Sequence, residues 1–355
     1  MKSEKSFQRY KTTKMEFGGT PGVTALIFML PIIVYTINLA CGKESCSITR
    51  LPKFPSFSYF FDMEATCIFF GWLAFQVVLS LLPVGQVIPG QLLNSGKRLM
   101  YRCNGSIIYD FFVGHELNPR IGSLDLKIFF ELRPGLIGWI MLNFVFVLKA
   151  YQDTGTLPPA LAMVTAFQTL YIADILYFES HFLTTMDIMH DGFGYMLAFG
   201  DLVWVPFLYC LQTRYLLEHP RDLTWYAMCG IALLNFVGYY IFRSSNSEKN
   251  EFRKNPHDPK FDNYETIPTA SGKKLLVSGW WGMVRKPNYL GDLCMALAWS
   301  LPCGLNAIPY FYPVYFLIFL VHRERRDSIE CYKKYGSSWD RYCQRVKYKI
   351  FPYIY

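Results

Sequence analysis

Long apolar stretches separated by short polar segments dominate the pattern of this chain. Residues 23–40 run for 18 positions without a charge, and residues 65–85 form a longer stretch. About 20 apolar residues cross the ~30 Å hydrocarbon core of a bilayer as a helix. Similar stretches cover residues 135–148, 160–178, 193–211, 224–242 and 293–320. A soluble fold would have to bury several such helices on all sides, so the pattern predicts an all-α polytopic membrane protein.

The charges between these stretches predict how the chain crosses the membrane. Lys and Arg are frequent in both terminal tails and in residues 97–133 and 243–274. Residues 151–159 contain neither, and residues 212–223 contain two Arg. By the positive-inside rule, the basic segments are cytosolic and the other two are lumenal. With a cytosolic N-terminus, six single spans return the chain to the cytosol before residue 243.

The last apolar stretch has to enter and leave the membrane on the same side, because the C-terminal tail is also basic. Pro302, Pro309 and Pro313 interrupt residues 293–320. We therefore expect a C-terminal helical hairpin there and about eight transmembrane helices in total. The expected organisation is a short basic cytosolic tail at residues 1–22 and one membrane domain at residues 23–355.

Composition adds little beyond this topology. The chain has 355 residues, 52% of them hydrophobic, with a formal net charge of +8 and 10 cysteines. No CxxC pair occurs with a matching second pair, which argues against a zinc site. Cys41 and Cys46 lie in an expected lumenal loop where they can form a disulfide, but unpaired thiols are the favoured interpretation.

Two cytosolic polar segments, residues 243–292 and 322–355, flank the expected hairpin and should meet at the cytosolic mouth of the helices. They combine Lys and Arg, which neutralise phosphates, with aromatic rings and with Asn and Asp side chains. No GxGxxG loop follows a strand, which excludes a Rossmann site. Residues 243–355 are thus a candidate pocket for a phosphorylated dinucleotide. The alternative is a basic flank that contacts anionic lipid headgroups.

Four motifs resemble those of a known family. Residues 105–120, GSIIYDFFVGHELNPR, and residues 320–336, LVHRERRDSIECYKKYG, are similar to the two hallmark motifs of the sterol reductases. Residues 184–194, TTMDIMHDGFG, and the final PYIY also resemble that family, in its Δ14-sterol reductase and lamin B receptor branch. The resemblance implies NADPH-dependent reduction of the C14–C15 double bond of sterol intermediates in cholesterol and sterol biosynthesis.

The resemblance also assigns the cofactor pocket residue by residue. Carried over by position, the residues that would line an NADPH pocket at the cytosolic end of the last helices are Lys249, Arg253, Trp281, Asn288, Tyr289, Asp292, Arg323, Asp327 and Tyr335. It further implies a sterol substrate, a bilayer environment and residence in the endoplasmic reticulum membrane or inner nuclear membrane, with both termini cytosolic or nucleoplasmic.

The chain departs from the family pattern in two places. Family members carry a further stretch, long enough for about two spans, between the motif at residues 97–105 and YDFFVGHELNPR, whereas here the two are fused. Ten helices would then become eight. The chain also has no counterpart of the long N-terminal region with which the lamin B receptor binds chromatin and lamin. Binding of nucleic acid or lamin is therefore not expected.

The reaction needs an acid, because an isolated carbon–carbon double bond does not accept hydride. Protonation at C15 of a Δ8,14-diene leaves a stabilised cation at C14 that takes hydride from the nicotinamide, with water excluded. An ionisable residue at membrane depth is the expected acid. Asp187, His190 and Asp191 in TTMDIMHDGFG are the candidates, and capping of the next helix is the alternative role for His190 and Asp191. Gly192 and Gly194 would permit close approach of a ligand.

Other interpretations stay open at this stage. Polar residues of the first hallmark motif are expected to form a structural ion-pair network, and they are Asp110, Glu116, Asn118 and Arg120. Residues 285–291 resemble the R-x-P-x-Y-x-G stretch of isoprenylcysteine-type methyltransferases. A Δ7 double bond is another possible target. A non-catalytic membrane scaffold related to the lamin B receptor is the remaining alternative, because the shortened helix bundle puts activity in doubt.

Overall fold

The computed structural model describes residues 10–11, 15–43, 46–47, 55–82, 102–103, 106–179, 183, 185–270 and 272–355. Most of the basic tail at residues 1–22 and of the motif at residues 97–105 lies outside these ranges. The chain divides into two units. The first comprises Met1–Leu157 and Gln168–His219, and the second comprises Pro158–Phe167 and Pro220–Tyr355. The expected cofactor segment, residues 243–355, belongs wholly to the second unit.

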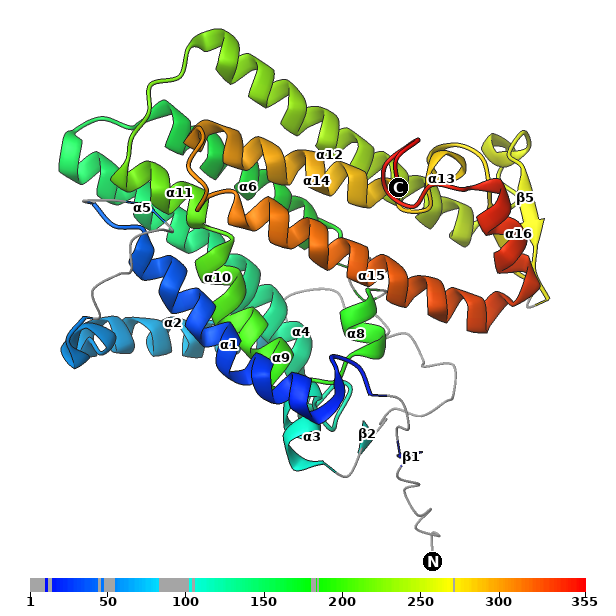
Figure 1. Ribbon diagram of the computed structural model, residues 1–355, viewed down its shortest axis with the longest axis horizontal. Coiled ribbons are helices and arrows are strands. Elements are labelled where there is room, and N and C mark those ends of the chain that lie inside the picture. Colours follow the sequence, from blue (N-terminus) through cyan, green and yellow to red (C-terminus); the bar gives the residue numbers. More distant parts are fainter. Residues whose placement is uncertain are drawn as a thin grey trace, which may run out of the picture. The chain divides into compact units, whose positions relative to one another are not determined.

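The described residues of the first unit form helices, two pairs of two-residue strands and an isolated bridge between Cys41 and Cys46 (Figure 1). Its strands are β1 (Tyr10–Lys11), parallel to β2 (Arg102–Cys103), and β3 (Arg120–Ile121), antiparallel to β4 (Leu124–Asp125). Its helices up to residue 154 are α1 (Gly19–Ala40), η1 (Phe57–Phe60), α2 (Met63–Leu81), α3 (Ile107–Val113), α4 (Leu126–Phe130), the π-helical η2 (Glu131–Ile137) and α5 (Gly138–Thr154). The later helices are α6 (Pro159–Tyr177), which starts in the second unit, α8 (Met186–His190), α9 (Tyr195–Phe199), the π-helical η3 (Gly200–Trp204), α10 (Val205–Leu208) and α11 (Leu211–Glu218).

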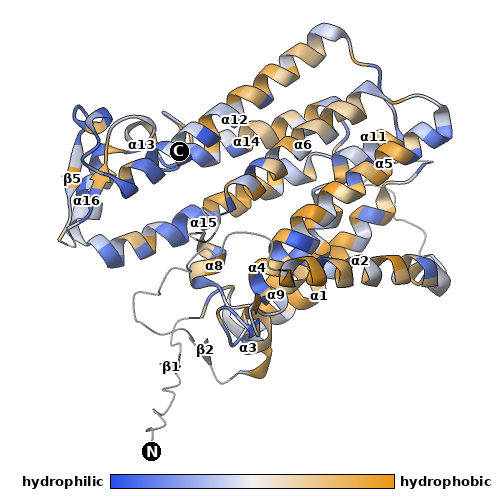
Figure 2. Ribbon diagram, turned by 180° about the vertical axis from the view of Figure 1, so that it is seen from behind, coloured by the Kyte–Doolittle hydropathy of each residue, from blue (hydrophilic) through white to orange (hydrophobic). Residues whose placement is uncertain are grey.

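The second unit contains the longest helices and one small antiparallel ribbon. Its elements are α12 (Trp225–Lys254), η4 (Pro259–Phe261), β5 (Thr266–Pro268) paired with β6 (Lys274–Leu276), α13 (Trp280–Met283), α14 (Pro287–Ser300), η5 (Leu301–Cys303), α15 (Phe311–Tyr335) and α16 (Ser337–Arg345). Helix α14 packs against both α12 and α15, and β5, α13 and α16 gather at one end of these helices (Figure 1). Hydrophobic residues dominate the long helices, whereas this end of the unit is largely hydrophilic (Figure 2).

Within the ranges that the structure describes, six helices are long and apolar enough to cross a membrane, and the chain is a multi-pass membrane protein. They are Gly19–Ala40, Ser58–Leu81, Leu126–Thr154, Pro159–Tyr177, Tyr195–Glu218 and Trp225–Lys254. Each corresponds to one of the single spans expected from the sequence, so this prediction is confirmed. The two that start furthest ahead of the expected stretches begin at residues 58 and 126, because their first turns are more polar than those stretches.

The hairpin expected at residues 293–320 is also present. Helix α14 ends at Ser300, the chain turns through η5 and residues 304–310, and α15 packs back against α14. Pro302 lies in η5, and Pro313 lies in the first turn of α15, where a missing backbone N–H costs no helical hydrogen bond. The total of eight membrane crossings stays a prediction.

Glycines bring α12 and α14 into backbone contact. A Cβ atom at Gly291 would lie 2.6 Å from the backbone oxygen of Gly238, and one at Gly238 would lie 2.8 Å from the backbone oxygen of Gly291. Small residues at helix contacts of membrane proteins let the backbones approach and gain van der Waals contact. Asn235 adds a polar contact, since its Oδ1 accepts a 3.0 Å hydrogen bond from the buried Trp299 Nε1.

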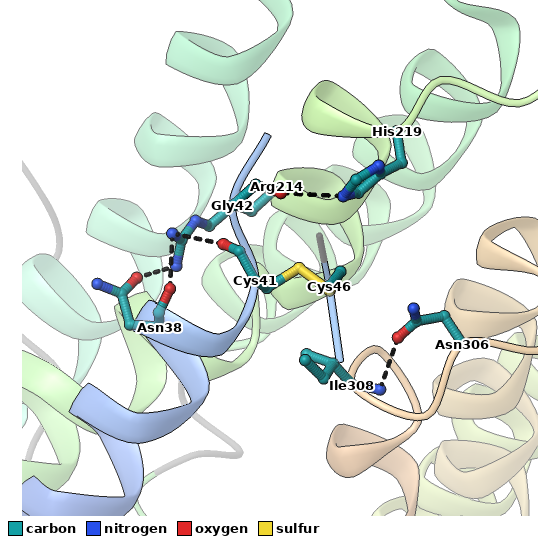
Figure 3. Close-up of a disulfide and its surroundings, with 8 residues drawn as sticks. All are labelled: Asn38, Cys41, Gly42, Cys46, Arg214, His219, Asn306 and Ile308. Carbon is teal, nitrogen blue, oxygen red and sulfur yellow. Dashed lines mark hydrogen bonds between the residues drawn. A yellow bond between two sulfur atoms is a disulfide. The ribbon is translucent and has the colours of Figure 1, made fainter. Parts of the chain in front are cut away.

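A disulfide between Cys41 and Cys46 closes the loop after α1 (Figure 3). The preference for unpaired thiols at these two positions was therefore wrong. Arg214 of α11 donates hydrogen bonds to the backbone oxygens of Asn38, at 2.9 Å, and Cys41, at 3.0 Å (Figure 3). These are carbonyls that the end of α1 leaves without helical partners. His219 Nε2 lies 3.1 Å from the oxygen of Gly42, so the disulfide loop is bound to the middle of α11 and to its C-terminal end.

Candidate functional site

Two of the family-like motifs lock together through their backbones in the first unit. Gly114 of GHELNPR has a φ of +84°, and a Cβ atom there would lie 2.5 Å from the nitrogen of Gly194. A Cβ atom at Gly192 would lie 2.5 Å from the oxygen of Val113. Only glycine fits such contacts. The close approach expected of Gly192 and Gly194 is therefore made to the chain's own backbone, and we call these three glycines the glycine interlock.

Lys127 of α4 forms hydrogen bonds to the backbone of the same two motifs. Its side chain is fully buried, and Nζ donates to the oxygens of Leu117, at 3.1 Å, and Ile188, at 3.2 Å, and to that of Asp191. An ammonium has three donors, and all three are used here. Sequence reasoning missed Lys127, which is one of several charges in the polar segment before the apolar stretch at residues 135–148.

The three candidate acids differ in their exposure. Asp187 on α8 is half-buried, His190 at the end of α8 is exposed, and Asp191, which follows the helix in an extended conformation, is buried. Asp187 and Asp191 are both within electrostatic range of Lys127. The structure thus brings two of the three candidates to one buried cation, and their part in catalysis stays a prediction.

The first hallmark motif forms an ion pair at its end. Arg120 of β3 contacts Asp125 at the end of β4, with 3.1 Å between the guanidinium nitrogen and Oδ2. The pair closes a two-stranded turn and does not connect two helices, as the expected network would have done. Asp125 also caps α4 by accepting a hydrogen bond from the Ile128 nitrogen, so the motif positions the helix that carries Lys127.

Helix α12 and the short helix α13 build one wall of the expected cofactor site. Trp281 is 6% exposed, and its Nε1 donates a 2.9 Å hydrogen bond to the Ser245 oxygen. The Lys249 ammonium lies 3.9 Å from the centre of the Trp281 ring, at cation–π distance. The Lys249 ammonium therefore packs against the Trp281 indole. A direct contact between Trp281 and a cofactor stays a prediction.

Glu248 holds α13 in this position. Its carboxylate accepts hydrogen bonds from the Trp280 nitrogen, at 3.1 Å, and from the Tyr264 hydroxyl, at 3.0 Å. Gly279 has a φ of +61°, and a Cβ atom there would lie 2.0 Å from Glu248 Oε1. The Gly in front of the two Trp residues is thus required by the carboxylate that anchors them.

Lys286 and Asp327 form an ion pair at the centre of the site. The Lys286 ammonium donates to Asp327 Oδ2, and the lysine side chain is 10% exposed. Burial lowers the pKa of Lys286, but the Asp327 carboxylate outweighs this effect and holds that pKa above its usual range. Burial raises the pKa of Asp327, and the charges of Lys286 and Lys249 overcome this and hold it at about 2. Both groups are therefore charged at neutral pH.

Further predicted residues surround this ion pair. Tyr289 is within electrostatic range of Lys286, Arg323, Asp327 and Asp292, and its ring centre lies 5.7 Å from Lys286 Nζ. Arg253 is within electrostatic range of Lys249, although it is exposed at the end of α12. Seven predicted residues are thus linked through charges or ring contacts, and they are Lys249, Arg253, Trp281, Tyr289, Asp292, Arg323 and Asp327. We call these seven, together with Lys286, the cationic site.

The two remaining predicted residues are placed differently. Asn288, in the first turn of α14, has a buried Oδ1 with no hydrogen-bond partner within the described part of the chain. Tyr335 ends α15 and packs against the buried cluster of Trp339, Tyr342 and Val346. Asn288 therefore offers an unused acceptor next to Tyr289, whereas Tyr335 contributes to the packing of α16.

Sequence reasoning did not select Lys286, although it lies in the basic stretch that was noted. Position alone does not tell which of two neighbouring cations, Arg285 or Lys286, faces the site. The structure separates them, because Arg285 Nε donates a 2.9 Å hydrogen bond to the Val346 oxygen, whereas Lys286 pairs with Asp327.

The final PYIY motif secures the same segment. The Tyr355 oxygen accepts hydrogen bonds from the nitrogens of Lys349, Ile350 and Phe351, at 2.8–3.1 Å. The residues before this turn bind the start of α14, since the Lys286 nitrogen donates a 2.8 Å hydrogen bond to the Lys349 oxygen. The motif therefore acts on the cationic site indirectly, by fixing the backbone of Lys286.

Comparisons with known proteins agree with these motifs. The ergosterol biosynthesis ERG4/ERG24 family model matches residues 104–355. The chain is 44% identical to the Delta(14)-sterol reductase TM7SF2 of Mus musculus, over 96% of this chain and 98% of that protein. It is 45% identical to the Delta(14)-sterol reductase LBR of Gallus gallus, over 95% of this chain and 64% of that protein. It is 54% identical to the Delta(14)-sterol reductase erg24 of Schizosaccharomyces pombe, over 71% of this chain and 60% of that protein.

The alignment with the mouse protein spans 408 positions, whereas this chain has 355 residues. At least 53 of these positions are therefore occupied in the mouse protein alone. This difference agrees with the shorter middle expected from the fused motifs. The similarity nevertheless extends over nearly the whole chain and includes both halves that carry the interlock and the cationic site. The chain belongs to the ergosterol biosynthesis ERG4/ERG24 family of sterol reductases.

Proposed function

We propose that this protein is an NADPH-dependent Δ14-sterol reductase of the endoplasmic reticulum membrane or inner nuclear membrane. The observation that carries the proposal is the match to the mouse Delta(14)-sterol reductase along 98% of that protein's length. The membrane helices suit a substrate that is dissolved in the bilayer. The cationic site supplies the charges that a phosphorylated dinucleotide needs.

The residues of the cationic site fit NADPH in two respects. Lys249, Arg253 and Arg323 provide positive charge for the phosphates, and Arg is suited to bidentate phosphate contacts. The buried Asn288 Oδ1 lacks a hydrogen-bond partner in the described chain, and an amide donor of a ligand would satisfy it. Lys286 is less suited to the phosphates, because Asp327 already neutralises it. We assign it the role of holding Asp327 and Tyr289 in place.

Bound NADPH would supply the hydride that adds to C14 of the sterol. The protein has to supply the proton for C15, orient the sterol and exclude water, which would otherwise capture the cation. The acidic residues around Lys127 are the proposed source of the proton, and Asp187 and Asp191 belong to this group. Asp191 is buried, whereas Asp187 is half-buried and remains in reach of water.

A non-catalytic membrane scaffold is the second candidate. It is favoured by the positions, at least 53 of them, that the mouse relative has and this chain lacks. A bundle that lost helices could keep the cationic site and still fail to bind a sterol. This candidate predicts NADPH binding without turnover.

The test is to express the chain in yeast that lacks its own C14 sterol reductase and to measure sterols by mass spectrometry. We expect Δ8,14 sterols to disappear with the wild-type chain and to persist with Arg323→Ala. The matched control is Arg325→Ala, because Arg325 is an exposed cation two residues away on the same helix. If the dienes persist with wild-type protein that is present in the membrane, the scaffold function is correct.

A further inference from the structure

A buried carboxylate that the sequence did not single out lies in the first unit. Asp201 belongs to the π-helical η3, inside the candidate span Tyr195–Glu218, and is 6% exposed. Its Oδ2 is buried and accepts no hydrogen bond from any residue that the structure describes. A bare carboxylate is costly in such a place, and ionisable groups within membrane helices commonly serve proton transfer.

The backbone around Asp201 forms wide, π-helical turns. Both η3 and its packing partner η2 are π-helical, and such widened turns are frequent at functional sites. A Cβ atom at Gly135 of η2 would lie 3.4 Å from the backbone oxygen of Asp201. Pro134 contributes to the wide turn because it has no N–H to donate. The two distorted segments therefore meet at Asp201.

The charged groups facing Asp201 come from two other elements. They are Lys127 of α4 and Asp187 of α8. Lys127 uses its three donors in hydrogen bonds to the backbone oxygens of Leu117, Ile188 and Asp191. Its positive charge therefore acts on Asp201, but it donates no hydrogen bond to that residue. Glu131, at the start of η2, is a further acid within range of Lys127. Asp125 and Asp191 also lie within range of Lys127, so one cation is shared by five carboxyl groups, and they cannot all be ionised at low cost.

We propose that Asp201 is the member of this group that holds a proton in the resting protein, and that it donates this proton to the sterol. This inference rests on the proposed function and deepens it. The O–H bond of Asp201 breaks as a C–H bond forms at C15, and the Asp201 carboxylate remains. Bound NADPH would supply the hydride for C14. The half-buried Asp187 then returns a proton taken from water, so each turnover consumes one NADPH and one proton.

Infrared spectroscopy of the purified protein tests the resting proton independently of activity. We expect the wild type to show the carbonyl band of a buried carboxylic acid, which Asp201→Asn removes and Asp201→Glu shifts. The control Asp153→Asn should leave the band unchanged, because Asp153 is an exposed residue paired with Lys149. A band that persists unchanged in both Asp201 variants overturns the proposal.

Turnover tests the donation of the proton. We expect Asp201→Asn to lower the rate of sterol reduction by about 10²–10⁴-fold, the usual contribution of a general acid. NADPH binding should be unchanged, and Asp201→Glu should recover part of the rate. A fall of less than about threefold in Asp201→Asn overturns the proposal, since general acids contribute far more. If the wild type binds NADPH without turnover, the proposed function fails, and the infrared band alone decides whether Asp201 holds the proton.

Discussion

The buried Lys286 and the half-buried Asp327 form an ion pair that joins the start of α14 to the C-terminal half of α15. The two helices are the arms of the hairpin, so the pair fixes their register where the cationic site is built. The lysine is nearly inaccessible, and removal of its partner would leave a buried charge uncompensated. Loss of Asp327 should therefore reduce both the stability of the protein and its affinity for the cofactor.

Asp327→Asn should destabilise the protein by about 3–5 kcal/mol, the usual cost of breaking a buried pair from one side. It should also weaken NADPH binding, because Tyr289 and Lys249 lose their common neighbour. Thermal unfolding in detergent, with and without NADPH, measures both effects. The matched control is Glu330→Gln on the same helix, since Glu330 pairs with Lys333 at an exposed position. That change should cost at most about 1 kcal/mol, and equal losses in the two variants would contradict the assignment.

The same pair predicts a specific dependence of stability on pH. The pKa of Asp327 falls to about 2 in the folded protein, below the value of about 3.9 for an unfolded chain. Its contribution is therefore complete above about pH 4 and is lost as the pH falls towards 2. The pKa of Lys286 is raised, so its contribution is complete below about pH 10 and is lost at higher pH. Between about pH 5 and 7 the unfolding temperatures of wild type and Asp327→Asn should differ by a constant amount. Towards higher pH the difference should shrink, because burial without the Asp327 carboxylate lowers the pKa of Lys286 in the variant. A difference that grows as the pH rises would be the contrary result.

Asn288→Ala should change cofactor affinity and not stability, because the buried Oδ1 has no partner to lose within the described chain. The loss of one hydrogen bond to the ligand should raise the KM for NADPH about three- to tenfold. Asn235→Ala is the matched control, since its Oδ1 accepts from the buried Trp299 Nε1. The control should lower the unfolding temperature and leave the KM unchanged. A reversed pattern would place the cofactor elsewhere.

Gly291→Ala should disrupt the contact between α12 and α14, because the added Cβ would lie 2.6 Å from the Gly238 oxygen. We expect a loss of about 1–3 kcal/mol, the usual cost of overpacking. Gly230→Ala on α12 is the control, since a Cβ there would meet nothing within 4 Å. Size-exclusion chromatography after heating compares the two variants in detergent. Equal behaviour would show that the helices do not approach as closely as described.

Cys41→Ser should remove the disulfide and destabilise the protein by about 2 kcal/mol, the loop-closure value for a short loop. Cys67→Ser is the control, because Cys67 is a free and exposed thiol on α2. The pair also reports orientation, since disulfides persist on the lumenal side and not in the cytosol. In intact microsomes, reduction should be needed before Cys41 and Cys46 react with a thiol reagent. Reaction without reduction would contradict a lumenal loop.

The membrane helices and the hairpin could be predicted from the sequence because length, apolarity and charge asymmetry are local properties. The disulfide could not, since the spacing of Cys41 and Cys46 permits a bond without requiring one. The role of Trp281 also depends on three-dimensional contacts. An aromatic residue among cations fits both a stacking platform and a core residue, and the structure places its indole in the core.

Asp201 shows a different limit of the sequence. It sits in an apolar stretch without a motif around it, and its importance comes from what surrounds it in space. Lys127 precedes it by many residues, and the π-helical turns that bring η2 and η3 together have no sequence signature beyond Pro134. A polar residue inside a predicted span was the available signal, and it did not distinguish Asp201 from Asp174.

The glycine interlock has a consequence for how this family tolerates changes in length. It is formed entirely by residues that follow position 106, through contacts of Gly114 with Gly192 and Gly194. Chain segments that precede α3 do not take part in it. Insertions or deletions upstream therefore leave the pairing of the two motifs intact, so evolution can vary the number of preceding helices while the acidic residues around Lys127 keep their geometry.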